Sequence, residues 1–487
     1  MSQSDSTPTK KPKKFRWLLW TALAGIFVLL ALSITAGLIA KSYVSPDYIV
    51  SAIEADNNCR VEIASTEVSL FSFPAKVEIK GVKITKRDEH ADAGTKLADR
   101  PPLPGGIINA ESITLNADLI DLIRKKISVE DLTIHKLYVA EFLIEREGGN
   151  SLDPLFDPPV TVKGSPNPEF EEKSERRKLA KQRRQLSKEE RSQEEDTPFA
   201  ISELPLPATM QALNITDGQI NAKIRKNKTR ITFSDVQIKI SKIDLDPNDL
   251  KNHNQAKVSI KGHLDIEDRD RTTKYADLDI QSEGDVIPFD PVTGYINPDL
   301  TYEITVLKGS KLETIPSLVK LAGKVKELNE LGLKLDALAD SVTFEKDTSV
   351  TLGYRDHTLT IADKAEIEFN GHLLTVHQGA WLHTGSNEHE AEAEVMLSEP
   401  ASETALANAR EFLTDKLPVD KEVVLKYTEK LLAPVIRDGR IFVPFTSKGD
   451  LNDPKVRPEV DLKSVAETLA LEALGDILDK AQDDAGK

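Results

Sequence analysis

Apolar and polar residues alternate with a period of two along most of this chain. The alternation begins at Val61, resumes near Ile113 and persists from Ala208 onward. In residues 388–397, four glutamates alternate with Ala391, Ala393 and Val395 on the opposite side. Because successive side chains of a strand point to opposite faces, this pattern predicts many short strands with one apolar and one polar face.

Helical spacing is confined to a few segments. The pattern predicts a short helix at 45–57 and longer ones at 312–331 and 402–436, the last with a break at Pro418. A C-terminal amphipathic helix and tail are predicted for 461–487. These helices are too few to cover every strand. The apolar faces must therefore pack together as a β-sandwich, which composition alone favours, or line a curled sheet filled by acyl chains.

An uncharged apolar stretch runs from Trp17 to Ala40 and follows five basic residues within 1–16. As a helix it is about 36 Å long, enough to cross a hydrocarbon core of about 30 Å. Positive charge stays on the cytoplasmic side, so residues 1–16 are predicted to be a cytoplasmic tail and 17–40 a single inner-membrane anchor. The alternative is a cleaved signal peptide, which the length of the run disfavours.

A charged segment at 164–197 interrupts the alternation. It mixes both charge signs with almost no apolar residues, which predicts a solvated helix or a disordered linker. The segment separates an N-terminal β region at 41–163 from a C-terminal β region at 198–460.

Composition excludes several classes of protein. The 487 residues carry a net charge of −16, and the positive charge concentrated in 1–16 leaves the remainder more acidic still, so no nucleic-acid partner is expected. Cys59 is the single cysteine, which rules out an intrachain disulfide and predicts a small buried side chain.

Chemistry-bearing motifs are missing from the sequence. No metalloprotease, redox-cysteine, serine-hydrolase, dinucleotide-binding or phosphate-loop motif occurs, so we expect no catalytic residue and no cofactor. The densest histidines, His372, His377, His383 and His389, match no established metal-ligand spacing and are interpreted as surface residues at strand ends. No metal is therefore predicted.

Four segments of the chain, together with the predicted N-terminal membrane helix, resemble the AsmA-like proteins. The first is VEIASTEVSLFSFPAKVEIKGVKIT at Val61–Thr85, with its Phe-Pro turn between two strands. AESITLNADLIDLIRKKISVEDLTI at Ala110–Ile134 and EFLIEREGGNSLDPLF at Glu141–Phe156 follow. Near the C-terminus, DGRIFVPFTSKGDLNDPKVRP at Asp438–Pro458 is similar to a family element. The likeness covers both ends of the chain and reaches the middle only through its strand content.

The resemblance implies a mainly β fold: an N-terminal transmembrane helix followed by an elongated, curled antiparallel β-sheet groove projecting into the periplasm. It implies a role in phospholipid transport between membranes or in outer-membrane biogenesis, without catalysis. The implied partners are phospholipid acyl chains, the inner membrane and outer-membrane or other envelope proteins. The predicted lining is Val61, Ile63, Val77, Ile79, Ile113, Leu115, Ile238, Ile260, Leu352 and Phe369.

The alternative function is a non-enzymatic envelope scaffold or a regulator of outer-membrane protein assembly, which would bind other proteins through its sheet edges. An enzyme acting on envelope polymers has no motif to support it.

Overall fold

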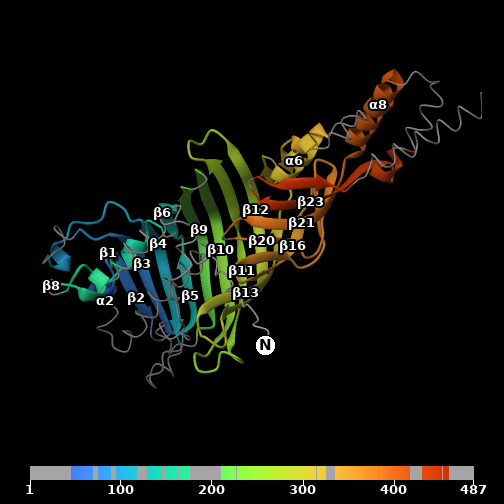
Figure 1. The fold of residues 1–487 in the computed structure, drawn as a ribbon. Coiled ribbons are helices and arrows are strands. Elements are labelled where there is room, and N and C mark those ends of the chain that lie inside the picture. Colours follow the sequence, from blue (N-terminus) through green and yellow to red (C-terminus); the bar gives the residue numbers. More distant parts are fainter. Residues whose placement is uncertain are drawn as a thin grey trace, which may run out of the picture. The chain divides into compact units, whose positions relative to one another are not determined.

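The computed structural model confirms a mainly β protein with few helices, in which most strands belong to a large, curled, mixed sheet (Figure 1). The residues that the structure describes are 45–69, 75–88, 95–117, 129–144, 150–162, 165–172, 174–175, 210–225, 228–313, 315–324, 335–384, 386–416, 430, 432–451 and 453–459.

The chain divides into two compact units. Unit 1 contains Met1–Tyr302 with Tyr354–His357, and unit 2 contains Glu303–Gly353 with Thr358–Lys487. This division joins the predicted 41–163 region with the first part of the predicted 198–460 region.

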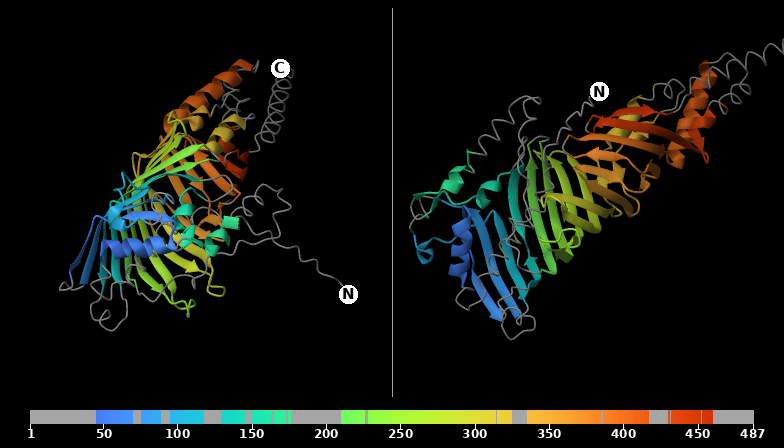
Figure 2. Two further views of the ribbon diagram at one scale, coloured as in Figure 1. Left: turned by 90° about the vertical axis from the view of Figure 1, so that its left-hand side faces the viewer. Right: turned by 60° about the horizontal axis from the view of Figure 1, so that its bottom comes forward.

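Unit 1 is built on long strands that lie side by side (Figure 2). Its strands are β1 (Cys59–Glu62), β2 (Ser65–Ser69), β3 (Ala75–Lys86), β4 (Ile108–Ala117), β5 (Val129–His135), β6 (Tyr138–Ile144), β9 (Ala212–Ile224), β10 (Thr229–Leu245), β11 (Asn254–Asp268) and β12 (Lys274–Phe289). β1 and β2 both pair with β3, and the order continues through β4, then β5 with β6, then β9, β10, β11 and β12. β13 (Ile296–Val306) begins in unit 1 and ends beyond its boundary.

The predicted antiparallel order is wrong at one junction. β9 runs parallel to β5 and β6, with Ile134 opposite Ile215 and Val139 opposite Ile220. Parallel neighbours need a crossover of a dozen or more residues, and the long connection between β6 and β9, which includes the charged segment 164–197, supplies it. The sheet is therefore mixed.

Shorter elements accompany this sheet. They are α2 (Pro46–Asp56), the 3-10 helices η2 (Leu97–Asp99) and η3 (Asp153–Phe156), and a separate pair, β7 (Thr161–Val162) with β8 (Ser165–Pro166). The helix predicted at 45–57 is confirmed as α2, whose first turn is capped because the Ser45 hydroxyl accepts a hydrogen bond from the Tyr48 amide at 3.3 Å. Of the charged segment, residues 165–166 form β8, and the buried Asn167 donates to the Pro159 carbonyl at 2.9 Å.

The strands of unit 2 are arranged around β21 (Glu388–Met396). The unit's other strands are β14 (Lys311–Leu312), β15 (Val342–Thr343), β17 (Thr358–Ile361), β18 (Ala365–Phe369), β19 (His372–Val376), β20 (Trp381–His383), β22 (Ile436–Arg437), β23 (Arg440–Asp450) and β24 (Lys455–Pro458), while β16 (Thr348–Arg355) crosses the boundary. β21 pairs with β19 and β20 on one side and with β23 on the other.

A two-residue turn joins β22 to β23. Asp438 and Gly439 have φ of 52° and 76°, the left-handed region that such hairpin turns require and that Asp and Gly tolerate well.

The helices of unit 2 are α6 (Pro316–Lys324), α8 (Glu399–Lys416) and the 3-10 helices η6 (Asp336–Ala339) and η7 (Ala433–Val435). α6 lies within the segment predicted as helix at 312–331. Within 402–436, α8 covers the first part, whereas the end of the segment forms η7 and begins β22. Leu318 and Leu321 of α6 are both fully buried, so this helix covers part of the unit 2 core.

No helix among the described residues is long and apolar enough to cross a membrane. The predicted tail at 1–16, the predicted anchor at 17–40 and the C-terminal segment 461–487 lie outside the residues that the structure describes.

Candidate functional site

One face of the unit 1 sheet is apolar from strand to strand. Cross-strand register places apolar residues opposite one another in continuous rows, because alternate residues of neighbouring strands share a face. One row contains Ile79, Ile113, Ile134, Ile215, Ile238 and Ile260; a second contains Val77, Leu115, Leu132, Leu213, Ile240 and Val258. We call this side of the sheet the apolar face.

Burial changes along these rows. At the end nearest β3, Ile79 is 2% exposed, and Leu132 on β5 is 0% exposed. On β10 and β11, Ile238 and Ile260 are only half-buried. Leu278 on β12 lies outside these two rows, opposite Leu264, and is also half-buried. The same face is therefore sealed at one end of the sheet and partly accessible at the other.

The sealed end is covered by α2 and η3, which lie against β1 and β3 (Figure 2). Ile49, Val50 and Ile53 of α2 and Leu155 of η3 belong to the same buried cluster as the first strands. Ile238 and Ile240 of β10 pack against this cluster but are only partly buried. The cover thus accounts for the burial of the first strands.

The opposite side of β11 and β12 is polar and charged. On β11 the residues that alternate with the apolar row are Gln255, Lys257, Ser259, Lys261, His263 and Asp265. Ion pairs join the two strands on this side, including Lys257 with Glu283. We call it the polar face. This strand pair therefore has one polar face suited to water and one apolar face.

The structure brings together most of the predicted lining residues. Val61, Val77, Ile79, Ile113 and Leu115 belong to the buried cluster of unit 1, and Ile63 and Ile238 pack against it. Ile260 is the direct cross-strand partner of Ile238.

The two remaining residues of that prediction lie in unit 2. Leu352 on β16 is half-buried, and Phe369 on β18 is 1% exposed. The Phe369 ring lies 5.4 Å from the His372 ring, centroid to centroid. Neither belongs to the buried cluster that holds the others.

The four clustered histidines have separate local roles. His372 is buried, and its Nδ1 accepts a hydrogen bond from the Ser398 amide at 2.9 Å. His389 is also buried and lies between the Gly449 carbonyl and the Ser447 hydroxyl, at 2.7 Å from each. His377 contacts Glu394 at 3.0 Å, and His383 contacts Ser386.

The interpretation of these histidines as surface residues is wrong for two of them. His372 and His389 are buried because each occupies an inward position of its strand and finds a local hydrogen-bond partner there.

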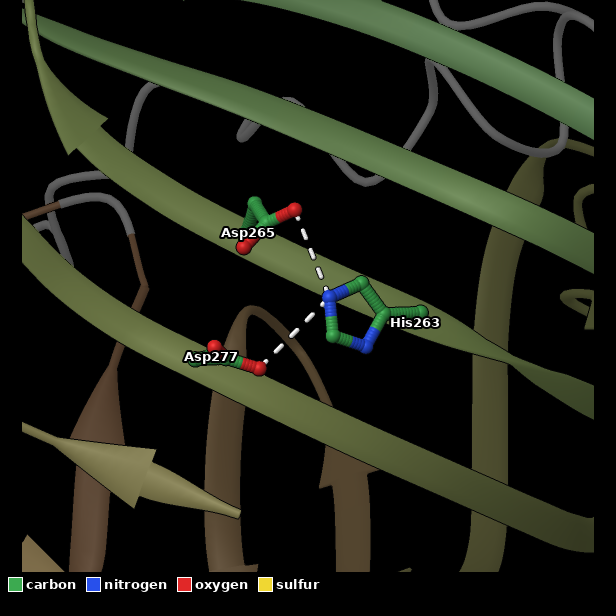
Figure 3. A group of neighbouring side chains, drawn as sticks. All are labelled: His263, Asp265 and Asp277. Carbon is green, nitrogen blue, oxygen red and sulfur yellow. Dashed lines mark ion pairs between the residues drawn. The ribbon is translucent and has the colours of Figure 1, made fainter. Parts of the chain in front are cut away.

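A different histidine lies in a group able to hold a metal ion. His263, Asp265 and Asp277 project from β11 and β12 with one ligand atom of each within 4.8 Å of the others (Figure 3). Sequence reasoning missed this group. Its signal is the spacing of His263 and Asp265 on one strand face, but Asp277 joins them only through the strand register.

Cys59 is 1% exposed, as predicted, and starts β1. Burial, reinforced by the nearby Glu54 carboxylate, raises the pKa of the thiol to about 12. A thiol that stays protonated inside the core is a packing residue and not a nucleophile.

No family model, curated protein or solved structure matches this chain. The resemblance to AsmA-like proteins therefore stays a prediction.

Proposed function

We propose that this protein binds phospholipid acyl chains along the apolar face of unit 1 and contributes to phospholipid transport between membranes or to outer-membrane biogenesis. Under this proposal, residues 17–40 anchor the chain in the inner membrane and the β regions lie in the periplasm. The chain performs no catalysis in this role.

The change in burial along the apolar face carries the proposal. Near β3 the apolar side chains are sealed, whereas Ile238 and its cross-strand partner Ile260 keep partial exposure, as does Leu278 opposite Leu264 on the same face. Contiguous accessible apolar rows bounded by polar side chains are typical of surfaces that bind apolar partners. A row of aliphatic side chains without polar atoms suits hydrocarbon tails, which need no directional contacts.

The β-sandwich alternative receives less support. Apart from the short β7–β8 pair, the described strands of unit 1 supply no second sheet to face β10, β11 and β12. Among the described residues, α2 and η3 cover the apolar face at the β1 and β3 end.

Site-specific photocrosslinking in cells tests the proposal on the full chain. A benzophenone amino acid at Ile260 projects from the apolar face, and one at the adjacent Lys261 projects from the polar face. We expect a phosphate-labelled lipid adduct from position 260 and little from position 261. Equal adducts from both positions, or protein adducts without lipid from position 260, would reject acyl-chain binding and favour the envelope scaffold.

Charge substitutions separate a lipid-binding surface from a sealed core. Ile260→Asp introduces a carboxylate at a half-buried position, where water can reach it, so we expect the protein to stay folded. With the benzophenone amino acid placed at Ile238 in this variant, the lipid adduct should be weaker than in the unaltered protein. Ile79→Asp places an unpaired charge at a position that is 2% exposed, which should unfold unit 1. If Ile260→Asp unfolds the protein as completely as Ile79→Asp, the face near Ile260 is sealed and the proposal fails.

A further inference from the structure

The polar face of β11 and β12 carries an unusual convergence of ligand-type side chains. His263 lies directly opposite Asp279, and Asp265 lies directly opposite Asp277 in the antiparallel register. Two consecutive positions of the same face therefore bring one imidazole and three carboxylates together (Figure 3 shows the imidazole with Asp265 and Asp277). Lys274 forms ion pairs with Asp265 and Asp277 of this group.

The distances resemble those between ligands of one metal ion. His263 Nε2 lies 3.3 Å from an Asp265 oxygen and 3.5 Å from an Asp277 oxygen. Both separations exceed the usual range of an N–H···O hydrogen bond, about 2.7–3.2 Å. Two ligand atoms bound to one tetrahedral zinc ion at about 2.0–2.1 Å stand roughly 3.3–3.4 Å apart.

The imidazole is oriented as a metal ligand would be. His263 Nδ1 lies 2.9 Å from Asp279 Oδ1, so Nδ1–H can donate to this carboxylate and leave the Nε2 lone pair facing Asp265 and Asp277. A carboxylate behind the histidine fixes the tautomer and ring orientation in many metal sites. Lys274 contacts Asp265 Oδ1 at 2.5 Å and Asp277 Oδ2 at 2.8 Å, whereas the oxygens facing Nε2 are Asp265 Oδ2 and Asp277 Oδ1.

Charge also favours a divalent ion. The carboxylates of Asp265, Asp277 and Asp279 meet at one imidazole, and a divalent ion would offset their negative charge. The side chains of His263, Asp265 and Asp277 are 28%, 25% and 41% exposed, so water can complete the coordination.

We propose that His263, Asp265 and Asp277 bind one zinc ion, with Asp279 orienting the imidazole from behind. The mixed nitrogen and oxygen ligands suit zinc better than calcium, which takes six to eight oxygen ligands. The ion would join β11 to β12 on the side opposite the apolar face. This inference does not depend on the proposed lipid function.

Calorimetric titration of the full chain with zinc chloride in metal-free buffer tests the site. We expect one tight equivalent in the unaltered protein, lost or weakened more than about tenfold in His263→Gln and Asp277→Asn, and weakened about 10- to 100-fold in Asp279→Asn. His253→Gln is the matched control, because His253 also contacts one aspartate, Asp244 at 2.8 Å, but lies outside the cluster.

Cobalt substitution gives a second readout that does not depend on affinity. Bound Co²⁺ should show the intense visible absorption of a low-coordinate site, and the band should disappear in His263→Gln while circular dichroism is unchanged. The proposal is overturned if the unaltered protein binds no zinc below millimolar concentration, if calcium binds as tightly as zinc, or if His263→Gln retains the full equivalent.

Discussion

One buried carboxylate links α2, which covers the sealed end of the apolar face, to the sheet. Glu54 on α2 is 7% exposed, and its Oε1 accepts a hydrogen bond from the Val61 amide of β1 at 2.9 Å. Its Oε2 lies 2.7 Å from Arg100 and 3.7 Å from Arg87. Replacing Glu54 with Ala removes this link between α2 and the sheet and leaves both guanidinium groups without their carboxylate partner.

The structure sets the expected size of the effect. Breaking a buried ion pair from one side costs about 3–5 kcal/mol. The two arginine side chains are 16–17% exposed, and Arg87 also donates to the Glu54 carbonyl, which the substitution retains. These features reduce the expected loss to about 2–3 kcal/mol, or roughly 30- to 150-fold in the equilibrium between docked and undocked α2.

Hydrogen exchange measured by mass spectrometry reports this local equilibrium. Peptides covering α2 and β1 in Glu54→Ala should exchange faster by that factor, while peptides from β11 and β12 should not change. Glu67→Ala is the matched control, because Glu67 also forms an ion pair, with Lys80 at 2.7 Å, but on an exposed surface. We expect this control to exchange as the unaltered protein does.

Two outcomes would refute the reasoning. If Glu54→Ala and Glu67→Ala give the same exchange in α2, the carboxylate does not hold the helix in place. If exchange increases equally in every strand of unit 1, Glu54 supports the whole unit and not the cover alone.

The remaining predictions concern two buried side chains. Burial, with a smaller contribution from Arg440, lowers the pKa of His372, so the unfolded chain takes up a proton more readily than the folded one. The stability that this group contributes is complete above about pH 6.5 and declines as the pH falls toward the folded pKa. In His372→Asn, the Oδ1 atom can accept the hydrogen bond from the Ser398 amide but does not titrate. We therefore expect the urea midpoint of this variant to depend less on pH between about 7.5 and 5.5 than that of the unaltered protein. Cys59 should resist maleimide at pH 7.5 in the native protein and react only after urea exposes β1, whereas labelling of the folded chain at the rate of a free thiol would contradict its burial and its raised pKa.

The period-two pattern predicted the faces of the strands because side-chain direction is a local property. Ile79, Ile113 and Ile260 share a face, as their spacing from polar neighbours indicated. The parallel pairing of β5 and β6 with β9 was not predictable in the same way. It depends on where the chain returns after the long connection from Ile144 to Ala212, and alternation within each strand is identical for parallel and antiparallel partners.

The candidate sites needed information between strands. Alternation places Ile79 and Ile260 alike, but their different burial follows from the docking of α2 and η3 at one end. In the same way, the distance of 3.5 Å between His263 and Asp277 follows from the register of β11 with β12. Neither property can be read from one strand alone.

Both proposed sites depend on the same register of β11 with its neighbouring strands. Its residues 256, 258, 260, 264 and 266 are apolar, and His263 and Asp265 occupy the intervening positions of the other face. A slip of one residue would turn the aspartate and histidine toward the apolar face and expose the isoleucines, because side chains alternate strictly. The opposite pair Asp265–Asp277 brings two like charges together, an arrangement that is unfavourable unless a cation balances it. Lys274 supplies one such charge, and a bound zinc ion would supply two more at the register in which Ile238 and Ile260 face each other. The polar face would in this way hold the apolar face in alignment.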